Sequence, residues 1–355
     1  VVPDQFTMQT QADVVKASVC KGIMNIEVLS FNRLAHRVFE ETGGGRRPVL
    51  DDTGKNLILR KCAGDVLEKI PYLSGNINKA GYIHEVKSAI SEFMQYGIAP
   101  DNVSMLKKCA ADSNRITLKN KLGDLEELYK YFTEYIKEQY ITTEEAMDIL
   151  AEEIYKSRIM NDSCVIFDGF TGFTPVQNKV IAALLDVCRQ VIIAIPLDGS
   201  SLTEEVKEQE LFAFTKKTYL SLVELAKERN CVIEEPLLLS AGARFSENLE
   251  LKYLEKNIFQ YPIVPYKDKC DRIYLDSCHD VNEEVGVLVR NIRKLVRDEG
   301  ARYKDIAVVS GNLPAYEAWI NEKFIEYDIP VYIDTTKGIV LNPFVEYIKS
   351  SLLMI

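Results

Sequence analysis

The feature that constrains this chain most is a short apolar run that leads through a glycine turn into a helix start, at residues 164–177. The run at 164–167 is CVIF, which is typical of a strand buried on both faces of a parallel sheet. Thr174 and Pro175 suit the cap and the first position of a helix, which we expect at 176–188. The stretch therefore predicts a strand–turn–helix unit of an α/β fold.

Asp168 stands where this strand should end, and Gly169 interrupts the pattern after it. In open α/β sheets, ligands bind outside the carboxyl ends of the strands. An acidic residue at this place is well positioned to face a phosphate, a metal or a nucleic acid. An ordinary turn that sends Phe170 and Phe173 into the core accounts for the pattern equally well.

The length of 355 residues suggests two or three domains, and the composition is that of an ordinary globular protein. A net charge of −10 argues against a uniformly basic surface for nucleic acid, although it leaves a local basic groove open. The eight cysteines are scattered without a C-x-x-C pair, which indicates reduced core cysteines and a cytoplasmic protein. We find no signal peptide and no apolar run long enough to cross a membrane, so no membrane partner is expected.

Both ends of the sequence look like interior parts of a larger chain. Residues 1–3 resemble the end of a strand, and the apolar-faced helix expected at 344–355 has no stop signal. We therefore expect a fragment of a longer protein.

Strand and helix patterns predict two α/β parts. In the first part, strand candidates and helices alternate at 1–3, 10–19, 26–31, 32–42, 164–168, 176–188, 191–195, 211–230 and 231–234. Residues 50–158 show helical periodicity without a convincing strand, and Thr142 to Glu145 has the pattern of a capping box. A block this long is not a loop, so residues 49–158 are predicted to be a helical insertion between 1–48 and 159–238.

A linker is predicted at 239–271 and a second α/β domain at 272–355. Its strand candidates and helices alternate at 273–275, 281–298, 306–309, 316–327 and 331–333. This alternation predicts a second parallel sheet with right-handed crossovers.

Motifs for catalysis or metal binding are not found. Residues 53–56 contain Gly-Lys but lack the upstream glycine and the final hydroxyl of a phosphate-binding loop. The glycines at 43–45 precede arginines, so capping and turn roles are favoured for both segments. The three histidines are far apart, and no zinc spacing or Ser-His-Asp grouping stands out. No catalytic residue and no metal ligand is therefore predicted.

Polar and aromatic residues follow three strand candidates of the first α/β part. They are Gln5 and Thr7, Phe31 and Arg33, and Asp168 and Phe170. Because the carboxyl ends of parallel strands meet at one edge of a sheet, these residues should cluster. Rings can stack on bases, arginine can bind phosphate or a guanine edge, and amide and hydroxyl groups can bind base edges, so single-stranded nucleic acid is one candidate ligand. The alternative is that Phe31 and Phe170 are core residues and Arg33 is a solvated residue at a helix start.

Six stretches, in chain order, resemble one family. They are VPDQFTMQTQ at 2–11, VLSFNRLAHRVFEETGG at 28–44, FDGFTGFTPVQ at 167–177, QELFAFTKKTY at 209–219, YKDIAVVSGNLPAYE at 303–317 and VYIDTTKGIVLNPFVEYIKSSL at 331–352. Together they extend over essentially the whole chain. The sequence resembles the AddB (RexB) family, the B subunits of the bacterial AddAB (RexAB) ATP-dependent helicase–nucleases that resect broken DNA ends.

The resemblance implies the fold of superfamily-one helicases, an α/β fold with two RecA-like parallel-sheet domains that each carry an insertion. In the family, a Walker A loop for ATP and magnesium lies upstream of the position of Val1. A nuclease domain with cysteines for an iron–sulfur cluster lies beyond the position of Ile355. No cofactor is therefore expected within this sequence, and none of its eight cysteines is expected to hold the cluster.

Two departures from active helicases are visible. Their paired acids at a strand end hold magnesium and activate water, but Gly169 follows Asp168 where the second acid would stand. The corresponding strand of the second domain usually ends near an arginine, and here it ends Val309-Ser310-Gly311. The motor motif is thus degenerate, and we predict that the fragment itself does not hydrolyse ATP, although its parent belongs to an ATP-dependent helicase/deoxyribonuclease.

The resemblance also implies a role in double-strand break repair by homologous recombination. An AddA-type partner would supply translocation in a heterodimer, while the AddB-type chain guides the 3′-ended strand from a duplex end and recognises the Chi sequence. The residues that match family positions implied in this recognition are Gln5, Thr7, Phe31, Arg33, His36 and Phe170, and His36 stands where the family often has Trp. The alternatives are an active superfamily-one ATPase without its nucleotide loop and a structural adaptor that contacts no bases.

Overall fold

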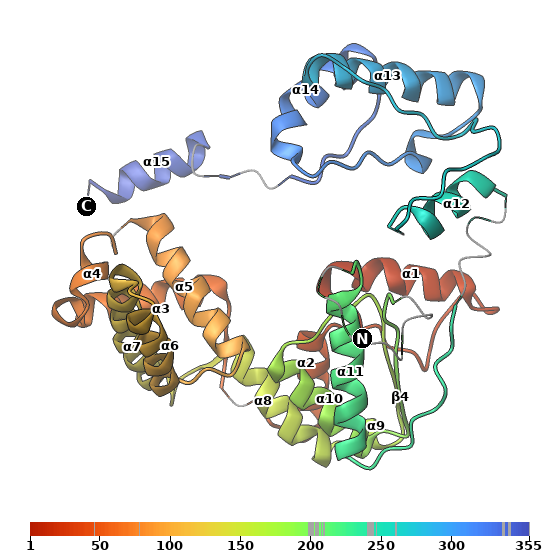
Figure 1. The fold of residues 1–355 in the computed structure, drawn as a ribbon. Helices are drawn as coiled ribbons and strands as arrows, with labels where there is room; N and C mark the ends of the chain where they lie inside the picture. The colour runs from red at the N-terminus through yellow and green to blue at the C-terminus, as the bar shows by residue number, and fades with distance from the viewer. Residues whose placement is uncertain are drawn as a thin grey trace. The chain divides into compact units, whose positions relative to one another are not determined.

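The chain forms two compact units in the computed structural model, Val1–Leu239 (unit 1) and Ser240–Ile355 (unit 2) (Figure 1). The structure describes residues 1–45, 47–77, 79–197, 202, 206, 208, 210–239, 245, 247–259, 261–335, 338–339 and 342–354. Within these residues, unit 1 holds two hydrophobic clusters and unit 2 holds one.

Unit 1 is mostly helical, with small parallel sheets. Its elements are η1 (Asp4–Phe6), α1 (Thr7–Ala17), α2 (Phe31–Thr42), β1 (Val49–Leu50), α3 (Asp52–Asp65), η2 (Leu67–Lys69), α4 (Pro71–Ser74), α5 (Ala80–Gln95), η3 (Pro100–Asn102), α6 (Val103–Asp112), α7 (Ile116–Ile136), β2 (Ile141–Thr142), α8 (Thr143–Glu153), η4 (Ile154–Lys156), α9 (Arg158–Asn161), β3 (Cys164–Phe167), α10 (Pro175–Val187), β4 (Gln190–Ile193) and α11 (Ala213–Glu228). Helices and parallel strands in one unit confirm the predicted α/β class.

Strands β3 and β4 pair in parallel, with Phe167 opposite Ile193. Side chains along β3 alternate between buried and exposed. Val165 and Phe167 are 7% and 0% exposed, whereas Ile166 between them is 50% exposed. Helices α2, α8 and α10 pack on the face of Val165 and Phe167. The expectation of a strand buried on both faces is therefore wrong: the other face of β3 remains open.

The first residues of the chain pair with β3 on the side away from β4. The N–H of Val1 donates to the carbonyl of Ile166, and the N–H of Asp168 donates to the carbonyl of Val1 at 3.0 Å. These two bonds are the pattern of a parallel ladder. The N–H of Val2 donates in turn to the carbonyl of Leu29 at 2.9 Å, so three segments far apart in sequence lie side by side.

Two predicted strands of unit 1 are wrong. Residues 26–30 are irregular, and Phe31 already begins α2. The side chain of Ser30 accepts a hydrogen bond from the Arg33 N–H, so it caps α2 and ends the extended chain one residue early. Residues 231–234 are also irregular, and Val232 is 93% exposed, with no neighbouring strand to pair with among the described residues.

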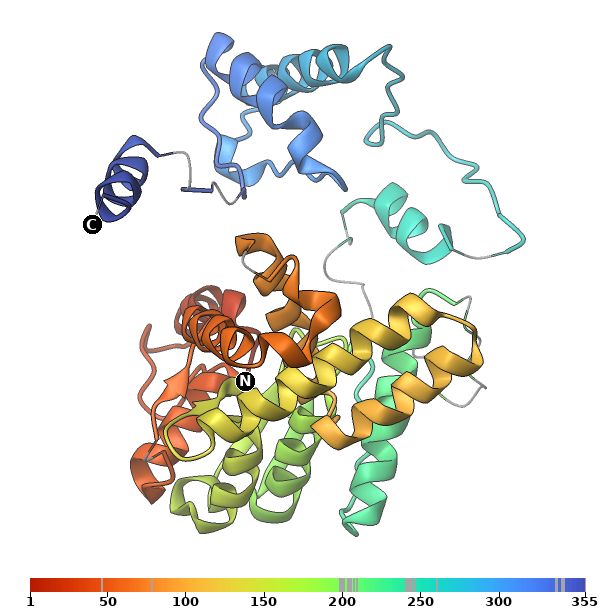
Figure 2. The ribbon, with the colours of Figure 1, turned by 90° about the vertical axis from the view of Figure 1, so that its left-hand side faces the viewer.

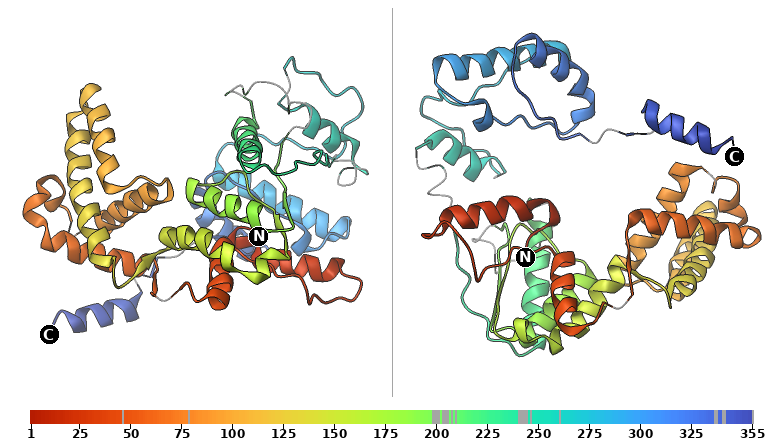
Figure 3. Two further views of the ribbon diagram at one scale, coloured as in Figure 1. Left: turned by 90° about the horizontal axis from the view of Figure 1, so that it is seen from below. Right: turned by 180° about the vertical axis from the view of Figure 1, so that it is seen from behind.

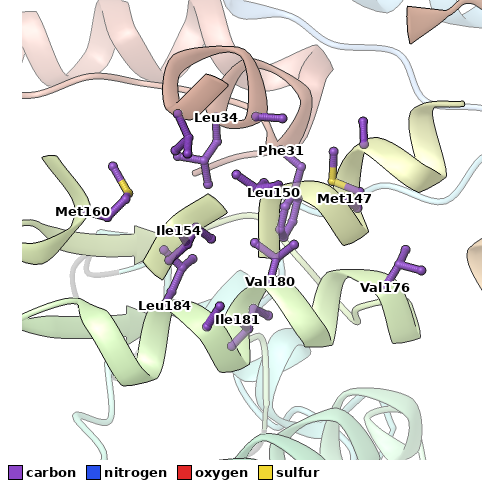
Figure 4. Close-up of a cluster of buried hydrophobic side chains, with 14 of the residues drawn as sticks. Phe31, Leu34, Met147, Leu150, Ile154, Met160, Val176, Val180, Ile181 and Leu184 are labelled. Carbon is purple, nitrogen blue, oxygen red and sulfur yellow. The ribbon is translucent and has the colours of Figure 1, made fainter. Parts of the chain in front are cut away.

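Helices α2, α8 and α10 enclose the first hydrophobic cluster. Figure 4 shows Leu34 of α2, Leu150 of α8 and Val180 and Leu184 of α10 pointing into the space between the helices, and each is at most 2% exposed. Burying a side chain of this size stabilises the fold by roughly 1.5–3 kcal/mol relative to leaving it in water. The buried face of β3 packs against this cluster through Val165 and Phe167.

Reciprocal capping boxes begin two of these helices. Thr142 and Glu145 cap α8, and Thr174 and Gln177 cap α10, with Pro175 at the first helical position. In each box a hydroxyl and a longer side chain satisfy two backbone N–H groups that would otherwise lack partners. Both predicted helix starts are confirmed.

The helices between residues 52 and 136 form the second hydrophobic cluster of unit 1. Helices α6 and α7 lie side by side in it (Figures 2 and 3). Five side chains of the cluster are at most 1% exposed: Leu59, Ile90, Leu128, Phe132 and Ile136. The last three are four residues apart along α7, which is helical spacing. That residues 49–158 are an insertion in the first α/β domain stays a prediction.

Short strands interrupt the segment that the sequence predicts to be free of strands. β1 and β2 pair in parallel, with Val49 opposite Ile141 and Leu50 opposite Thr142, and the Ile141 N–H donates to the Pro48 carbonyl at 3.1 Å. A strand of two residues is too short to produce a detectable alternation, and its partner lies some ninety positions away, so the local pattern could not reveal the pair.

The glycine segments that the sequence assigned to capping and turns do lie at helix ends. Gly43 caps α2 with φ +78°, and the Gly54 N–H donates to the side chain of Asp51 at the start of α3. Lys55 of α3 is buried and pairs with Glu144 at 2.7 Å. The ammonium of Lys55 therefore has its counter-charge inside the fold.

The cysteines are free, but most of them are not core residues. Cys62 is buried, whereas Cys20, Cys109, Cys164 and Cys270 are exposed. The expectation of core cysteines is wrong because short polar loops and helix surfaces, rather than the hydrophobic clusters, carry most of them. Burial raises the pKa of the Cys62 thiol to about 11.

Unit 2 contains α12 (Leu249–Asn257), α13 (Val281–Asp298), η6 (Tyr303–Asp305), α14 (Leu313–Glu326) and α15 (Pro343–Leu352). Helices α13 and α14 pack on each other and bury the third hydrophobic cluster. Helix α12 lies inside the segment predicted to be a linker.

The predicted second parallel sheet is not formed in the described part of unit 2. Residues 273–275, 306–309 and 331–333 are irregular. Leu275, Val309 and Tyr332 are 99%, 93% and 87% exposed, and none of these segments pairs with another as a strand within the described residues. Across the described ranges of both units, no helix is both long and apolar enough to cross a membrane.

Candidate nucleic-acid interface

The predicted site residues follow the carboxyl ends of three neighbouring segments. The hydrogen bonds of Val1 and Val2 hold residues 1–2, the segment ending at Ser30, and β3 side by side. We call the residues that follow them, 3–7, 31–33 and 168–170, the sheet edge. A carbon added as Cβ to Gly169 would lie 3.4 Å from Pro3 Cδ, so the first and third of these groups are in contact.

Phe31 and Phe170 meet at this edge, but inside the protein. Their ring centroids are 5.6 Å apart at an interplanar angle of 74°, and Phe167 and Phe173 complete a cluster of four rings. Phe31 and Phe170 are 7% and 9% exposed. Edge-to-face packing of this kind favours the core. This burial favours the core role that the sequence left open for both residues.

Gln5 and Thr7 lie in consecutive turns of helix. Gln5 is exposed within η1, so its amide group is available to a ligand. Thr7 is 8% exposed, and its hydroxyl donates to the Asp4 carbonyl at 3.0 Å. The hydroxyl proton of Thr7 is therefore used by its own helix.

Arg33 and His36 are exposed and stand three residues apart on α2, which places them on the same side of the helix. Over the described ranges of the chain, no acidic side chain forms an ion pair with Arg33. Its neighbour Arg37, in contrast, pairs with Glu27 at 3.2 Å. The guanidinium of Arg33 can thus bind a base edge or a phosphate without first breaking a contact.

The turn after β3 explains why Gly169 occupies the place of a second acid. Its φ is +79°, in the left-handed region that costs an L residue roughly 1–2 kcal/mol. A side chain there would start 3.4 Å from Pro3 and 3.6 Å from Phe6. Asp168 before it is exposed and is the single carboxylate of this turn.

The structure adds one residue that the sequence reasoning missed. Phe6 lies between Gln5 and Thr7, is 44% exposed and approaches Gly169. The available signal was an aromatic residue between two polar ones just after a strand end. Among the described residues there is no group of three His, Cys, Asp or Glu side chains that could hold a metal ion. The exposed residues near this edge offer four kinds of group that suit binding of nucleic acid: the amide of Gln5, the ring of Phe6, the guanidinium of Arg33 and the imidazole of His36.

The chain matches a known family and several named proteins. The model of the family "ADDB, N-terminal" matches residues 1–255. The B subunit of an ATP-dependent helicase/deoxyribonuclease from Lachnoclostridium phytofermentans is 38% identical over 99% of this chain and 31% of the relative. Proteins of the same name from Acetivibrio thermocellus and Alkaliphilus metalliredigens are each 33% identical, over 99% of this chain and 30% of the relative.

The chain spans about 30% of the length of these relatives. The family match extends over well more than half of the 355 residues, and it includes the whole sheet edge. The chain therefore belongs to the AddB family.

Proposed function

We propose that this chain is part of a helicase-like subunit that has lost motor activity, guides the 3′-ended strand of a broken DNA end and recognises Chi. Unit 1 is proposed to contain the first RecA-like domain, with residues 49–158 as its helical insertion, and residues 272–355 of unit 2 are proposed to be part of the second. The names of the relatives, which are subunits of ATP-dependent helicase/deoxyribonucleases, support membership in such a complex. The protein would act in the cytoplasm.

The observation that carries the proposal is the exposed Arg33, which has no ion-pair partner in the described part of the chain. It shares the sheet edge with Gln5 and stands three residues before His36 on α2. Arg33 can bind a guanine edge with two hydrogen bonds, and the amide of Gln5 can bind adenine. One good pair of this kind discriminates between bases by roughly 1–3 kcal/mol. Such a preference suits a protein that lets most sequences pass.

The loss of motor activity is supported by the conformation of Gly169. Because its φ is +79°, a conformation that costs an L residue free energy, the turn disfavours the second carboxylate that active helicases use with magnesium. We therefore propose that an AddA-type partner supplies translocation in a heterodimer. ATP, magnesium and an iron–sulfur cluster would be held by other parts of the complex.

The test is Arg33→Ala in the full-length protein assembled with its motor partner. Unwinding of a duplex end and the response to Chi are measured separately. We expect normal unwinding and a Chi response weakened by roughly 5- to 150-fold, because the base-edge contact is lost. Arg37→Ala, which removes an arginine already paired with Glu27, is the matched control and should respond normally.

A structural adaptor that contacts no bases is the second candidate, and the burial of Phe31 and Phe170 favours it. Its prediction for the same experiment is different: Arg33→Ala would both unwind DNA and respond to Chi like the unaltered complex. That result would contradict the proposed recognition of Chi. An active ATPase would instead require DNA-stimulated ATP turnover by this protein when the partner's own motor is disabled.

A further inference from the structure

The loop at residues 168–173 has two exposed phenylalanine rings placed against its two glycines. Phe214, from the first turn of α11, lies on Gly172: an added Cβ at Gly172 would be 2.6 Å from Cε1 and 2.7 Å from Cζ of the ring. Phe6, from η1, lies beside Gly169, with its Cδ2 3.6 Å from the Cβ position. Each ring therefore lies beside a glycine of the loop, and Phe214 is the closer of the two.

These two rings differ from the buried cluster next to them. Phe214 is 65% exposed and Phe6 is 44% exposed, whereas Phe31 and Phe170 are 7% and 9% exposed. Phe214 is therefore mostly exposed and Phe6 partly exposed, although each has a glycine of the loop beside it. An aromatic ring that is held in place and still open on one side is the arrangement that stacks on an unpaired base.

We propose that Phe6 and Phe214 are stacking platforms for the bases of single-stranded DNA. This inference rests on the proposed function, because it assumes that the sheet edge faces a DNA strand. The two phenylalanines and the two polar residues of the edge then have different roles. Stacking tolerates every base because each base has a π-face, so Phe6 and Phe214 hold any sequence, while Arg33 and Gln5 discriminate.

The surroundings of the rings fit a nucleic-acid strand. Gln5 directly precedes Phe6, and Lys217 follows Phe214 by three residues on α11 and is exposed. Lys217 forms a surface pair with Glu208 at 3.3 Å, and exposed pairs of this kind are weak enough to exchange for a phosphate. The loop between the rings adds the exposed Thr171.

The test uses the full-length protein in complex with its motor partner, and an oligothymidylate that carries one 2-aminopurine as a reporter of stacking. Phe6→Ala and Phe214→Ala should each weaken binding roughly tenfold. Phe6→Tyr and Phe214→Tyr should restore it, because they keep the ring. Met8→Ala, which removes an apolar side chain that is 82% exposed just after the sheet edge, is the control and should bind normally.

Gly172→Ala separates the support of the ring from the ring itself. The new methyl group would collide with Phe214 at 2.6 Å and displace it, without a positive φ at this glycine to strain the backbone. We expect a several-fold loss of binding although Phe214 is still present. If Gly172→Ala binds normally, the idea of a glycine-supported platform is wrong.

The outcomes distinguish this inference from the function on which it rests. Normal binding of oligothymidylate by Phe6→Ala and Phe214→Ala overturns the platform, and the proposed function stands if Arg33→Ala still loses its Chi response. Weak binding of all sequences supports the platform, even if Arg33→Ala responds to Chi normally. If the phenylalanine variants instead fail to co-purify with the motor partner, the rings are a protein contact and the platform is rejected.

Discussion

Charge is arranged in opposite ways in the helical part of unit 1 and at its sheet edge. In the helical part, Lys55 and Glu144 are 3% and 8% exposed and lie 2.7 Å apart. At the sheet edge, Arg33 is exposed, and the described part of the chain offers it no ion-pair partner. In the helical part, each charge of the buried pair is neutralised by its partner inside the fold. At the sheet edge, the charge of Arg33 stays available to a ligand. Buried charge should therefore matter for stability, and the charge at the edge for binding.

The largest effect is expected when the buried pair is broken. Glu144→Gln leaves the ammonium of Lys55 without a counter-charge in a buried site, which should lower the free energy of unfolding by about 3–5 kcal/mol. Urea unfolding of the chain measures this loss. The matched control is Asp148→Asn, which breaks the exposed pair with Lys179 at 2.6 Å and should cost at most about 1 kcal/mol.

If Glu144→Gln loses less free energy of unfolding than Asp148→Asn, the buried pair does not stabilise the fold. The double variant Lys55→Met, Glu144→Leu sharpens the result. It removes both charges from the same site, so much of the stability should return.

The sequence predicted the helices of both parts well because the signals of a helix are local. Helix α13 begins at Val281 and ends at Asp298, as its periodicity predicts, and Thr174 caps α10. Strands are different, because a strand depends on a partner that is distant in sequence. The segments at 273–275 and 306–309 have strand-like composition and no partner in the described part of unit 2.

The candidate site could be predicted only to the level of topology. The rule that parallel strands end at one edge brought Gln5, Arg33 and Phe170 to the same region. The rule says nothing about exposure, so it did not distinguish the buried ring of Phe170 from the exposed ring of Phe6. The support of Phe214 by Gly172 joins two segments forty residues apart, and no local pattern reports such a contact.

Asp52 and Lys87 provide an intermediate case between the buried pair and the edge. Their charged atoms are 3.0 Å apart, with Lys87 buried and Asp52 mostly exposed. The hydrogen bond from Lys87 holds the pKa of Asp52 below its ordinary value of 3.8. A lowered pKa in the folded state means that the pair stabilises the fold above pH 3.8 and loses this contribution as the pH falls through the folded-state value.

We therefore expect Asp52→Asn to cost about 1–3 kcal/mol at pH 7, because it leaves the buried ammonium of Lys87 without a counter-charge, while solvent screens the exposed carboxylate. The difference from the unaltered chain should shrink as the pH is lowered below the ordinary value of 3.8. Urea unfolding of both proteins across this range measures it. A difference that stays constant with pH would mean that Asp52 acts through packing and not through its charge.

The smallest effect on stability is expected for Arg33→Ala. Ser30 is the N-cap of α2, so Arg33 stands in the first turn of the helix, where the macrodipole disfavours a cation by roughly 0.3–1 kcal/mol. Alanine also has the higher helix propensity. Removing Arg33 should leave the free energy of unfolding unchanged or raise it by up to about 0.5 kcal/mol, whereas Arg37→Ala loses its surface pair with Glu27. A guanidinium that does not help its own helix supports the proposal that Arg33 binds a ligand outside the chain. If urea unfolding shows that Arg33→Ala loses more than about 1 kcal/mol, Arg33 serves the fold, and the contrast between buried and available charge fails at the residue on which it most depends.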